Sequence, residues 1–92
     1  MQKMLHVEQS RSFAKIAKKL PKSQKKELDE AVRCILNDPE IGERKKGDLD
    51  FVRVYKFRMN RQLTLLAYSC NNKILTLLAL GGHENFYRDL KG

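Results

Sequence analysis

The chain contains little cysteine. Among its 92 residues only Cys34 and Cys70 occur, and they form neither a CxxC pair nor a cluster with the two histidines. Such a pattern argues against a zinc site and against a disulfide scaffold. We therefore expect no metal and no cofactor. Both cysteines are predicted to be reduced, small hydrophobic residues buried in the core of a cytoplasmic protein.

Long apolar segments are also missing. The sequence has no apolar run of 18 residues, and its first ten residues lack the hydrophobic core of a signal peptide. We expect a soluble protein that is neither secreted by this route nor inserted in a membrane. A chain of 92 residues suffices for one modest core but not for two, so residues 1–92 are predicted to form a single domain.

The common catalytic motifs are absent as well. There is no glycine-rich phosphate loop, no GxSxG motif, no metal-ligand spacing and no Cys–His arrangement typical of thiol proteases. Cleavage of RNA by its own 2′-OH group remains compatible with so few residues. That reaction requires cations, which stabilise charge developing on the phosphate, and a proton shuttle, but it requires no metal.

Acidic residues are the scarcer of the two charge types. The chain has 19 Lys/Arg against 11 Asp/Glu and a net charge of +8. This balance indicates a polyanionic partner, which is a nucleic acid, a membrane surface or an acidic protein, unless the charge merely solvates the surface. Residues 44–61 alone account for +5, and this concentration favours a binding site. The cations there are Arg44, Lys45, Lys46, Arg53, Lys56, Arg58 and Arg61.

Apolar spacing predicts a strand followed by two helices. Met4–Glu8 alternates in polarity, with His6 expected as an exposed edge residue. Ser10 is the predicted N-cap of a first helix that Pro21 ends, and Ser23 is the predicted cap of a second helix that ends at residues 37–39. The apolar stripes of this helical hairpin must pack against a sheet. They comprise Phe13, Ile16, Ala17, Leu20, Leu28, Ala31, Val32, Ile35 and Leu36.

The second half of the chain predicts a loop, three strands and a short helix. Residues 39–50 form the loop, residues 51–59, 63–70 and 73–80 the strands, and residues 84–90 the helix, with a two-residue turn at Asn71–Asn72. The last two strands are apolar at nearly every position, so they are expected in the centre of the sheet. One face of this sheet is expected to be incompletely covered, which favours a protein partner. The predicted fold is a two-layer α+β domain with an antiparallel sheet.

Basic and apolar residues alternate between Phe51 and Arg58. A period of two is typical of a strand with one core face and one exposed face. Lys56 and Arg58 share one face and are predicted to bind phosphates, although a solvated rim or a patch facing a protein partner would show the same pattern. Arg53 has the opposite parity and is expected to be structural.

The order of these elements resembles the RelE/ParE superfamily, the small basic toxins of bacterial type II toxin–antitoxin systems. The resemblance runs along the whole chain, through Ser12-Phe13, Asn37-Asp38-Pro39, Lys46-Gly47, Val54–Arg58, Leu66-Ala-Tyr68 and Leu80–His83. It implies a ribosome-dependent mRNA endonuclease or, in the ParE branch, a non-enzymatic inhibitor of DNA gyrase. It also implies a cognate antitoxin, laid over the sheet and its flanking groove. A degenerate member that only binds its antitoxin is a third alternative.

The resemblance also assigns the site residues. Lys56 and Arg58 match the basic strand pair that contacts RNA in RelE-like members, whereas Leu65 stands where those members have a third cation. His83 matches the catalytic position of the histidine-using, YafQ-like members, and Phe86 or Tyr87 matches their following aromatic residue. The Asp before the third strand of those members has no counterpart, because Leu63 stands near it.

We therefore predict catalytic roles for His83, Arg58 and Tyr87, and RNA or phosphate binding by Lys56, Arg58, Lys45, Lys46 and Arg61. A histidine after a Gly-Gly strand exit is expected to be accessible, and its pKa near neutrality suits proton transfer. His83 could instead cap the last helix or remain idle, and Tyr87 could cover the sheet rather than stack on a base. Arg88 is a weaker candidate.

Overall fold

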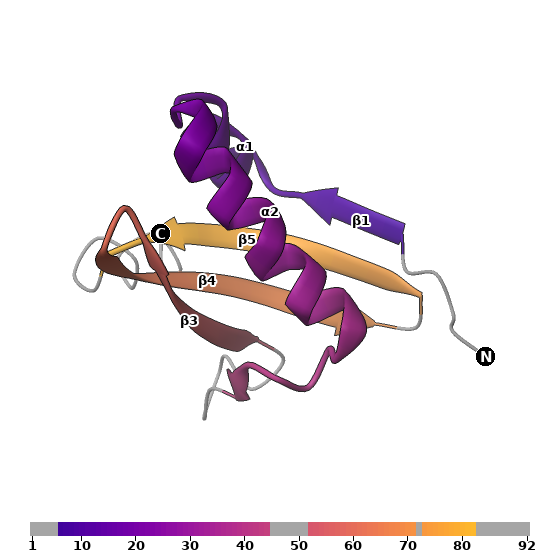
Figure 1. The fold of residues 1–92 in the computed structure, drawn as a ribbon. Helices are drawn as coiled ribbons and strands as arrows, with labels where there is room; N and C mark the ends of the chain where they lie inside the picture. The colour runs from indigo at the N-terminus through magenta and orange to yellow at the C-terminus, as the bar shows by residue number, and fades with distance from the viewer. Residues whose placement is uncertain (1–5, 45–51, 72, 83–92) are drawn as a thin grey trace.

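The protein folds as two helices packed on one face of a five-stranded sheet (Figure 1). The computed structural model describes residues 6–44, 52–71 and 73–82. The sheet order is β1-β5-β4-β3-β2, so the first strand lies beside the last. The elements are β1 (His6–Gln9), α1 (Arg11–Lys18), α2 (Lys22–Asn37), β2 (Glu43–Arg44), β3 (Arg53–Met59), β4 (Gln62–Asn71) and β5 (Ile74–Gly81). The predicted helix at residues 84–90 lies outside the described residues.

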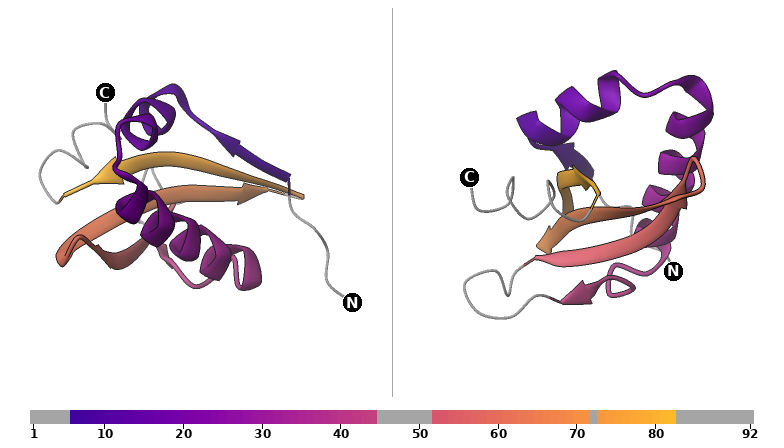
Figure 2. Two further views of the ribbon diagram at one scale, coloured as in Figure 1. Left: turned by 45° about the horizontal axis from the view of Figure 1, so that its top comes forward. Right: turned by 90° about the vertical axis from the view of Figure 1, so that its left-hand side faces the viewer.

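The α+β prediction is confirmed, with one difference in strand direction. The β2–β3, β3–β4 and β4–β5 pairs are antiparallel, but β1 pairs with β5 in parallel. A parallel neighbour requires a long crossover, and the chain between these two strands supplies it. In Figure 2 both helices cover the same side of the curved sheet.

Local signals explain where the helices begin. The Ser10 hydroxyl accepts a hydrogen bond from the Phe13 amide at 3.1 Å, as the predicted N-cap should. The prediction for Ser23 was wrong, because α2 already begins at Lys22 after Pro21, without a side-chain cap. Proline is well suited to this boundary, since its fixed φ and missing N–H cost nothing there.

The main core lies between the helices and the sheet. Phe13, Leu28 and Ile35 from the predicted stripes pack against Leu66 and other strand residues, and each is at least 95% buried. Tyr55 and Phe57 extend this cluster along β3, where their rings stack with centroids 6.0 Å apart. The prediction that the helical stripes pack on the sheet is confirmed.

The face of the sheet turned away from the helices, hereafter the outer face, is also buried at its centre. Leu65, Ala67 and Ala79 there are each at most 2% exposed. The expectation of an incompletely covered apolar face was therefore wrong at the centre of the sheet. Towards the strand ends, however, Leu63 and Ile74 on this face are 54% and 41% exposed. The two cysteines also differ from expectation. Cys34 and Cys70 are free but exposed. Cys34 lies outside the buried stripe of Leu28, Ala31 and Ile35 on α2, and Cys70 lies at the end of β4.

The strand boundaries differ from the predicted ones by at most two residues. The turn between β3 and β4 is formed by Asn60 and Arg61, which both have positive φ, as a two-residue hairpin of the primed type requires. Asn71 remains in β4 and pairs with Ile74, so the predicted turn is displaced by one residue. The predicted loop at 39–50 contains the two-residue strand β2. Within the described ranges neither helix is long and apolar enough to cross a membrane.

Candidate functional site

Strand β3 presents two cations side by side on the outer face. Lys56 and Arg58 are both exposed, whereas Tyr55, Phe57 and Met59 between and beside them are partly buried against the helices. Residues two apart on a strand have Cα atoms about 6.7 Å apart and project from the same face. The sequence prediction that the pair shares one exposed face is therefore confirmed.

The strand register places this pair at the end of the central strands. Lys56 lies opposite Leu65, and Leu65 lies opposite Gly81, so the three residues form one row across β3, β4 and β5. Two strand spacings separate Lys56 from Gly81, which is about 10 Å. Arg58 lies opposite Leu63, beyond the last pair between β4 and β5. Lys56 is thus level with the end of β5 at Gly81, and Arg58 lies just beyond this end. Gly81 precedes His83 by two residues in the sequence.

This row also explains why Leu65 stands where RelE-like members have a third cation. Leu65 is 1% exposed and packs with Val54, Ala67 and Ala79, so its position is part of the core of the outer face. A charged side chain there would be removed from water at a large cost. Leu63, next to Arg58 on the same face, is instead the exposed apolar residue of the site.

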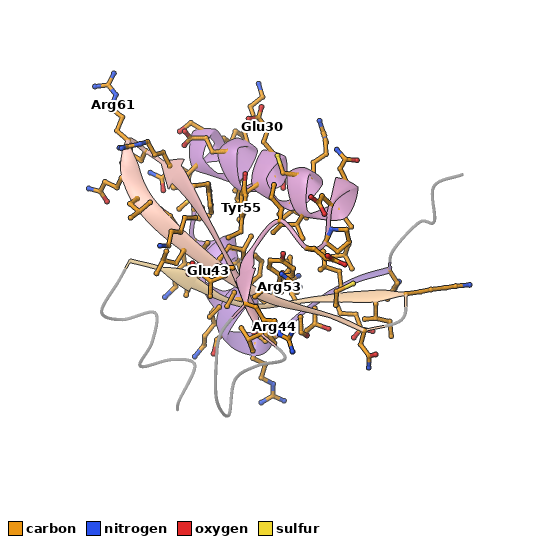
Figure 3. The ribbon with its side chains drawn as sticks, turned by 90° about the horizontal axis from the view of Figure 1, so that it is seen from below. Glu30, Glu43, Arg44, Arg53, Tyr55 and Arg61 are labelled. Atoms are coloured by element: carbon orange, nitrogen blue, oxygen red, sulfur yellow. The ribbon has the colours of Figure 1, made fainter. Side chains whose placement is uncertain are left out.

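Arg61 lies at the tip of the β3–β4 hairpin. Figure 3 shows its side chain pointing away from the sheet. Glu27 of α2 fixes the tip, because its carboxylate accepts a hydrogen bond from the Asn60 amide at 2.9 Å. Arg61 is thus accessible, but it belongs to the turn rather than to the row of Lys56.

Arg53 has a structural role, as its parity predicted. One of its guanidinium nitrogens, Nη1, donates to the carbonyl oxygens of Gly42 at 2.9 Å and Glu40 at 3.2 Å. Figure 3 shows Arg53 close to Glu43 and Arg44, in agreement with the pairing of Arg44 and Arg53 between β2 and β3. Its charge therefore fastens the segment before β2 to β3.

Tyr68 holds the same segment from inside the molecule, which the sequence analysis missed. Its hydroxyl donates to the carbonyl oxygen of Pro39 at 2.7 Å and accepts from the Gly42 amide at 2.9 Å. Burial is the main cause that raises the pKa of Tyr68, while the Gly42 amide and the Arg53 charge oppose the shift. We call Tyr68, Arg53 and the segment 39–42 the β2 clamp. It fixes the chain directly before the basic residues 44–46.

Gly42 fits the clamp because it has no side chain. A Cβ atom at this position would lie 2.7 Å from the Tyr68 hydroxyl oxygen and 2.8 Å from its ring carbon Cε1. From the sequence this position was predicted as part of the loop at residues 39–50. The signal that points to the role of Gly42 is Tyr68, which directly follows the aliphatic residues 65–67 of a central strand, because a buried hydroxyl requires partners.

A groove opens on the helical side of the domain. It has a volume of about 590 Å³ and lies between β1, α1, α2 and β5. Its apolar lining consists of Val7, Phe13, Ala14, Ala17, Leu28, Val32 and Leu77. Lys18, Lys25, Glu8 and Asp29 add charge to it. Its walls thus offer an apolar surface of the size that suits a peptide segment.

The remaining predicted site residues are not all placed. Lys45, Lys46, His83, Phe86, Tyr87 and Arg88 lie outside the described residues, so their roles stay predictions. His6 is exposed on the edge strand, as predicted, and its Nε2 lies 3.5 Å from a carboxylate oxygen of Glu8. In the described residues no three His, Cys, Asp or Glu side chains gather as potential metal ligands.

A family model for the ParE-like toxin of type II bacterial toxin–antitoxin systems matches residues 7–91. The chain belongs to this family. The predicted membership of the RelE/ParE superfamily is thus confirmed, whereas the YafQ-like subtype stays a prediction. Comparison with curated protein sequences found no match.

Solved structures of toxins share this fold. A double mutant of Escherichia coli RelE in the free state has a TM-score of 0.75 at 15% identity, covering 97% of this chain and 93% of its own. The intact E. coli RelBE toxin–antitoxin complex gives a TM-score of 0.68 at 18% identity, covering 87% and 98%. The archaeal RelE–RelB complex from Pyrococcus horikoshii gives 0.59 at 19% identity, covering 89% and 98%. At these identities the likeness shows the fold alone.

Proposed function

We propose that this toxin is a ribosome-dependent mRNA endonuclease that acts in the cytoplasm without a metal. The observation that carries the proposal is the exposed pair Lys56 and Arg58 on β3, in register with the end of β5. A rigid strand holds both cations before the substrate arrives, which is the arrangement that stabilises transition-state charge most effectively.

The proposed chemistry is transfer of the phosphoryl group within the RNA. The 2′-oxygen attacks the neighbouring phosphorus, the bond to the 5′-oxygen breaks, and a cyclic phosphate remains on the upstream fragment. His83 is the proton shuttle: it takes the proton from the 2′-OH and returns one to the leaving 5′-oxygen. Arg58 pairs with the charge that develops on the phosphate, and Lys56 holds the same or the next phosphate. Lys45, Lys46 and Arg61 bind the flanking backbone, and Tyr87 stacks on a base.

Primer extension on cellular mRNA after brief induction of the toxin tests this proposal. We expect translation arrest with new mRNA ends for the wild type, and loss of those ends for Arg58→Ala and for His83→Ala with folding intact. Lys73→Ala serves as the matched control, because Lys73 is also exposed but lies at the opposite end of the sheet, in the β4–β5 turn. Unchanged cleavage by His83→Ala would remove the histidine from the mechanism.

Inhibition of DNA gyrase without RNA cleavage is the second candidate, because the matching family model is the ParE-like one. It predicts intact mRNA, DNA damage and inhibition of supercoiling by the purified toxin. A toxin that produces neither effect but still binds its antitoxin would be the degenerate alternative. The two assays together separate all three.

We also propose that a cognate antitoxin neutralises the toxin and that one of its segments occupies the groove between β1, α1 and α2. The likeness to the RelBE and RelE–RelB complexes supports a partner of this kind. Ala17→Glu places a charge in the groove, whereas Ser12→Glu places one on the exposed side of α1 outside it. We expect the first substitution, but not the second, to prevent co-purification with the antitoxin and to leave toxicity intact.

A further inference from the structure

The largest concentration of positive charge lies on the helical hairpin rather than on β3. Residues 11–26 contain seven Lys/Arg and no Asp or Glu, which gives +7 against +5 for residues 44–61. Five of the seven cations, Lys18, Lys19, Lys22, Lys25 and Lys26, surround the junction between α1 and α2. We call them the hairpin lysines.

The hairpin lysines are free to bind a partner. All five are exposed. In the part of the chain that the structure describes, none of them forms an ion pair or a side-chain hydrogen bond. The fold gathers them from two helices, since Lys18 of α1 and Lys25 of α2 line the same groove. Their charges therefore act together on one end of the helical layer.

Helix stability does not explain this placement. Lys22, Lys25 and Lys26 occupy the first turns of α2, where the helix macrodipole is positive and acidic residues are favoured, yet the first turn contains no acid. Lys22 and Lys26 are also four residues apart, a spacing at which like charges repel. The sequence thus retains three cations where they weaken the helix, which points to a role in binding.

The chemistry of the cluster selects the partner. We propose that the hairpin lysines bind the phosphate backbone of folded, double-helical RNA, as a second surface distinct from Lys56 and Arg58. Lysine acts as a flexible point charge suited to phosphates, and no aromatic side chain between residues 18 and 26 can stack on an unpaired base. Such contacts position a protein on RNA without reading its sequence.

Other anionic partners fit the surface less well. A protein partner requires apolar or aromatic anchors, which the groove offers beside Lys18 and Lys25. Lys19, Lys22 and Lys26, however, do not line that groove. A membrane surface requires exposed apolar residues that insert. Leu20, the one large apolar residue among the hairpin lysines, packs against the core instead. The choice of RNA over DNA rests on the proposed function, because a toxin that cuts mRNA on the ribosome must dock against ribosomal RNA.

The test measures binding of the full-length protein to a 16-base-pair, 2′-O-methyl RNA duplex, which 2′-OH chemistry cannot cut. Fluorescence anisotropy at several salt concentrations gives the affinity and its salt dependence. We compare the wild type with Lys22→Gln/Lys26→Gln, which removes two hairpin lysines that do not line the groove. The matched control is Arg33→Gln/Lys73→Gln, which removes two exposed cations outside the acid-free segment.

Each phosphate contact contributes about 0.7–0.9 to the slope of log affinity against log salt, so losing two lowers the slope by about 1.4–1.8. With equal affinities of the variant and the wild type at 1 M salt, this difference in slope makes the variant bind roughly 20- to 60-fold more weakly than the wild type at 0.1 M salt. The control should keep the wild-type slope. The melting temperature of the hairpin variant should equal or exceed that of the wild type. The substitutions remove two cations from the positive end of the α2 dipole and abolish the repulsion between Lys22 and Lys26.

Three results would overturn the proposal. One is a hairpin variant that binds the RNA duplex with the wild-type slope. Another is a variant that keeps RNA binding but loses affinity for the antitoxin, which would make the surface a protein-docking site. The third is tighter binding to a DNA duplex of equal length that is lost through the same substitutions. Failure of mRNA cleavage in the primer-extension assay is a separate result, because it leaves the duplex measurements unchanged.

Discussion

Replacing Tyr68 by phenylalanine tests the β2 clamp directly. The substitution removes one oxygen atom and with it both hydrogen bonds, to the Pro39 carbonyl and from the Gly42 amide. Gly42 is buried and Pro39 is partly buried, so the amide loses its partner completely and the carbonyl keeps some access to water. A buried polar group without a partner costs about 1–3 kcal/mol. We expect the free energy of unfolding to fall by about 2–3 kcal/mol in total.

Urea unfolding followed by circular dichroism at pH 7 measures this loss. For a domain of this size 1 kcal/mol corresponds to about 4–8 °C, so the melting temperature should fall by roughly 8–24 °C. Tyr55→Phe is the matched control, because Tyr55 is only partly buried and the hydrogen-bond partner of its hydroxyl, Cys34, is exposed. That variant should lose less than about 1 kcal/mol. Equal losses in the two variants would refute the clamp.

The pH dependence gives an independent reading of the same hydroxyl. Burial raises the pKa of Tyr68 above its ordinary value of 10.0 in the folded protein. The unfolded chain therefore loses the tyrosine proton first as the pH rises, and the folded state binds more protons in that range. The contribution of Tyr68 to stability is complete below pH 10 and declines above it. The wild type should lose more stability between about pH 10 and 11 than Tyr68→Phe does.

Three further substitutions test other parts of the fold by the same unfolding measurement. Gly42→Ala should cost about 1–3 kcal/mol, because the new Cβ would stand 2.7 Å from the Tyr68 hydroxyl oxygen. Ser10→Ala should cost about 1–2 kcal/mol through loss of the cap, whereas Ser12→Ala on the exposed side of α1 should change little. Leu65→Arg should cost more than about 3 kcal/mol because it buries a charge, and Leu63→Arg, two residues away on the same face, less than about 0.5 kcal/mol. Equal effects at positions 63 and 65 would contradict the assigned outer-face core.

Much of the fold could be read from local patterns. The cap at Ser10, the helical stripes and the alternation along β3 are each encoded within a few residues, so the sequence alone places both helices and the parity of Lys56, Arg58 and Arg53. The parallel pairing of β1 with β5 depends on contacts between the two ends of the described chain. No local pattern encodes such a contact.

In the candidate site, too, some features follow from local sequence patterns and others depend on residues distant in the sequence. Exposure of Lys56 and Arg58 follows from strand periodicity, but burial of Leu65 depends on neighbours from β3 and β5. Cys34 and Cys70 were expected in the core because free cysteine is usually buried, but Cys34 lies on the exposed side of α2 and Cys70 at the exposed end of β4. Tyr68 was read only as a landmark of the family, since its partners are 26 and 29 residues away in the chain.

The pairing of β1 with β5 also has a consequence for how the toxin is made. The Ser10 hydroxyl that caps α1 donates to the Leu78 carbonyl, 68 residues further along, so the first helix is fastened only when the last strand is present. A chain emerging from the ribosome can form the α2 helix and the β3–β4 hairpin early, but β1 must wait for β5. Truncated products that end before Ile74 therefore lack the partner of β1. A nascent chain that has not yet reached β5 therefore cannot carry the completed surface formed by β1, α1 and the sheet.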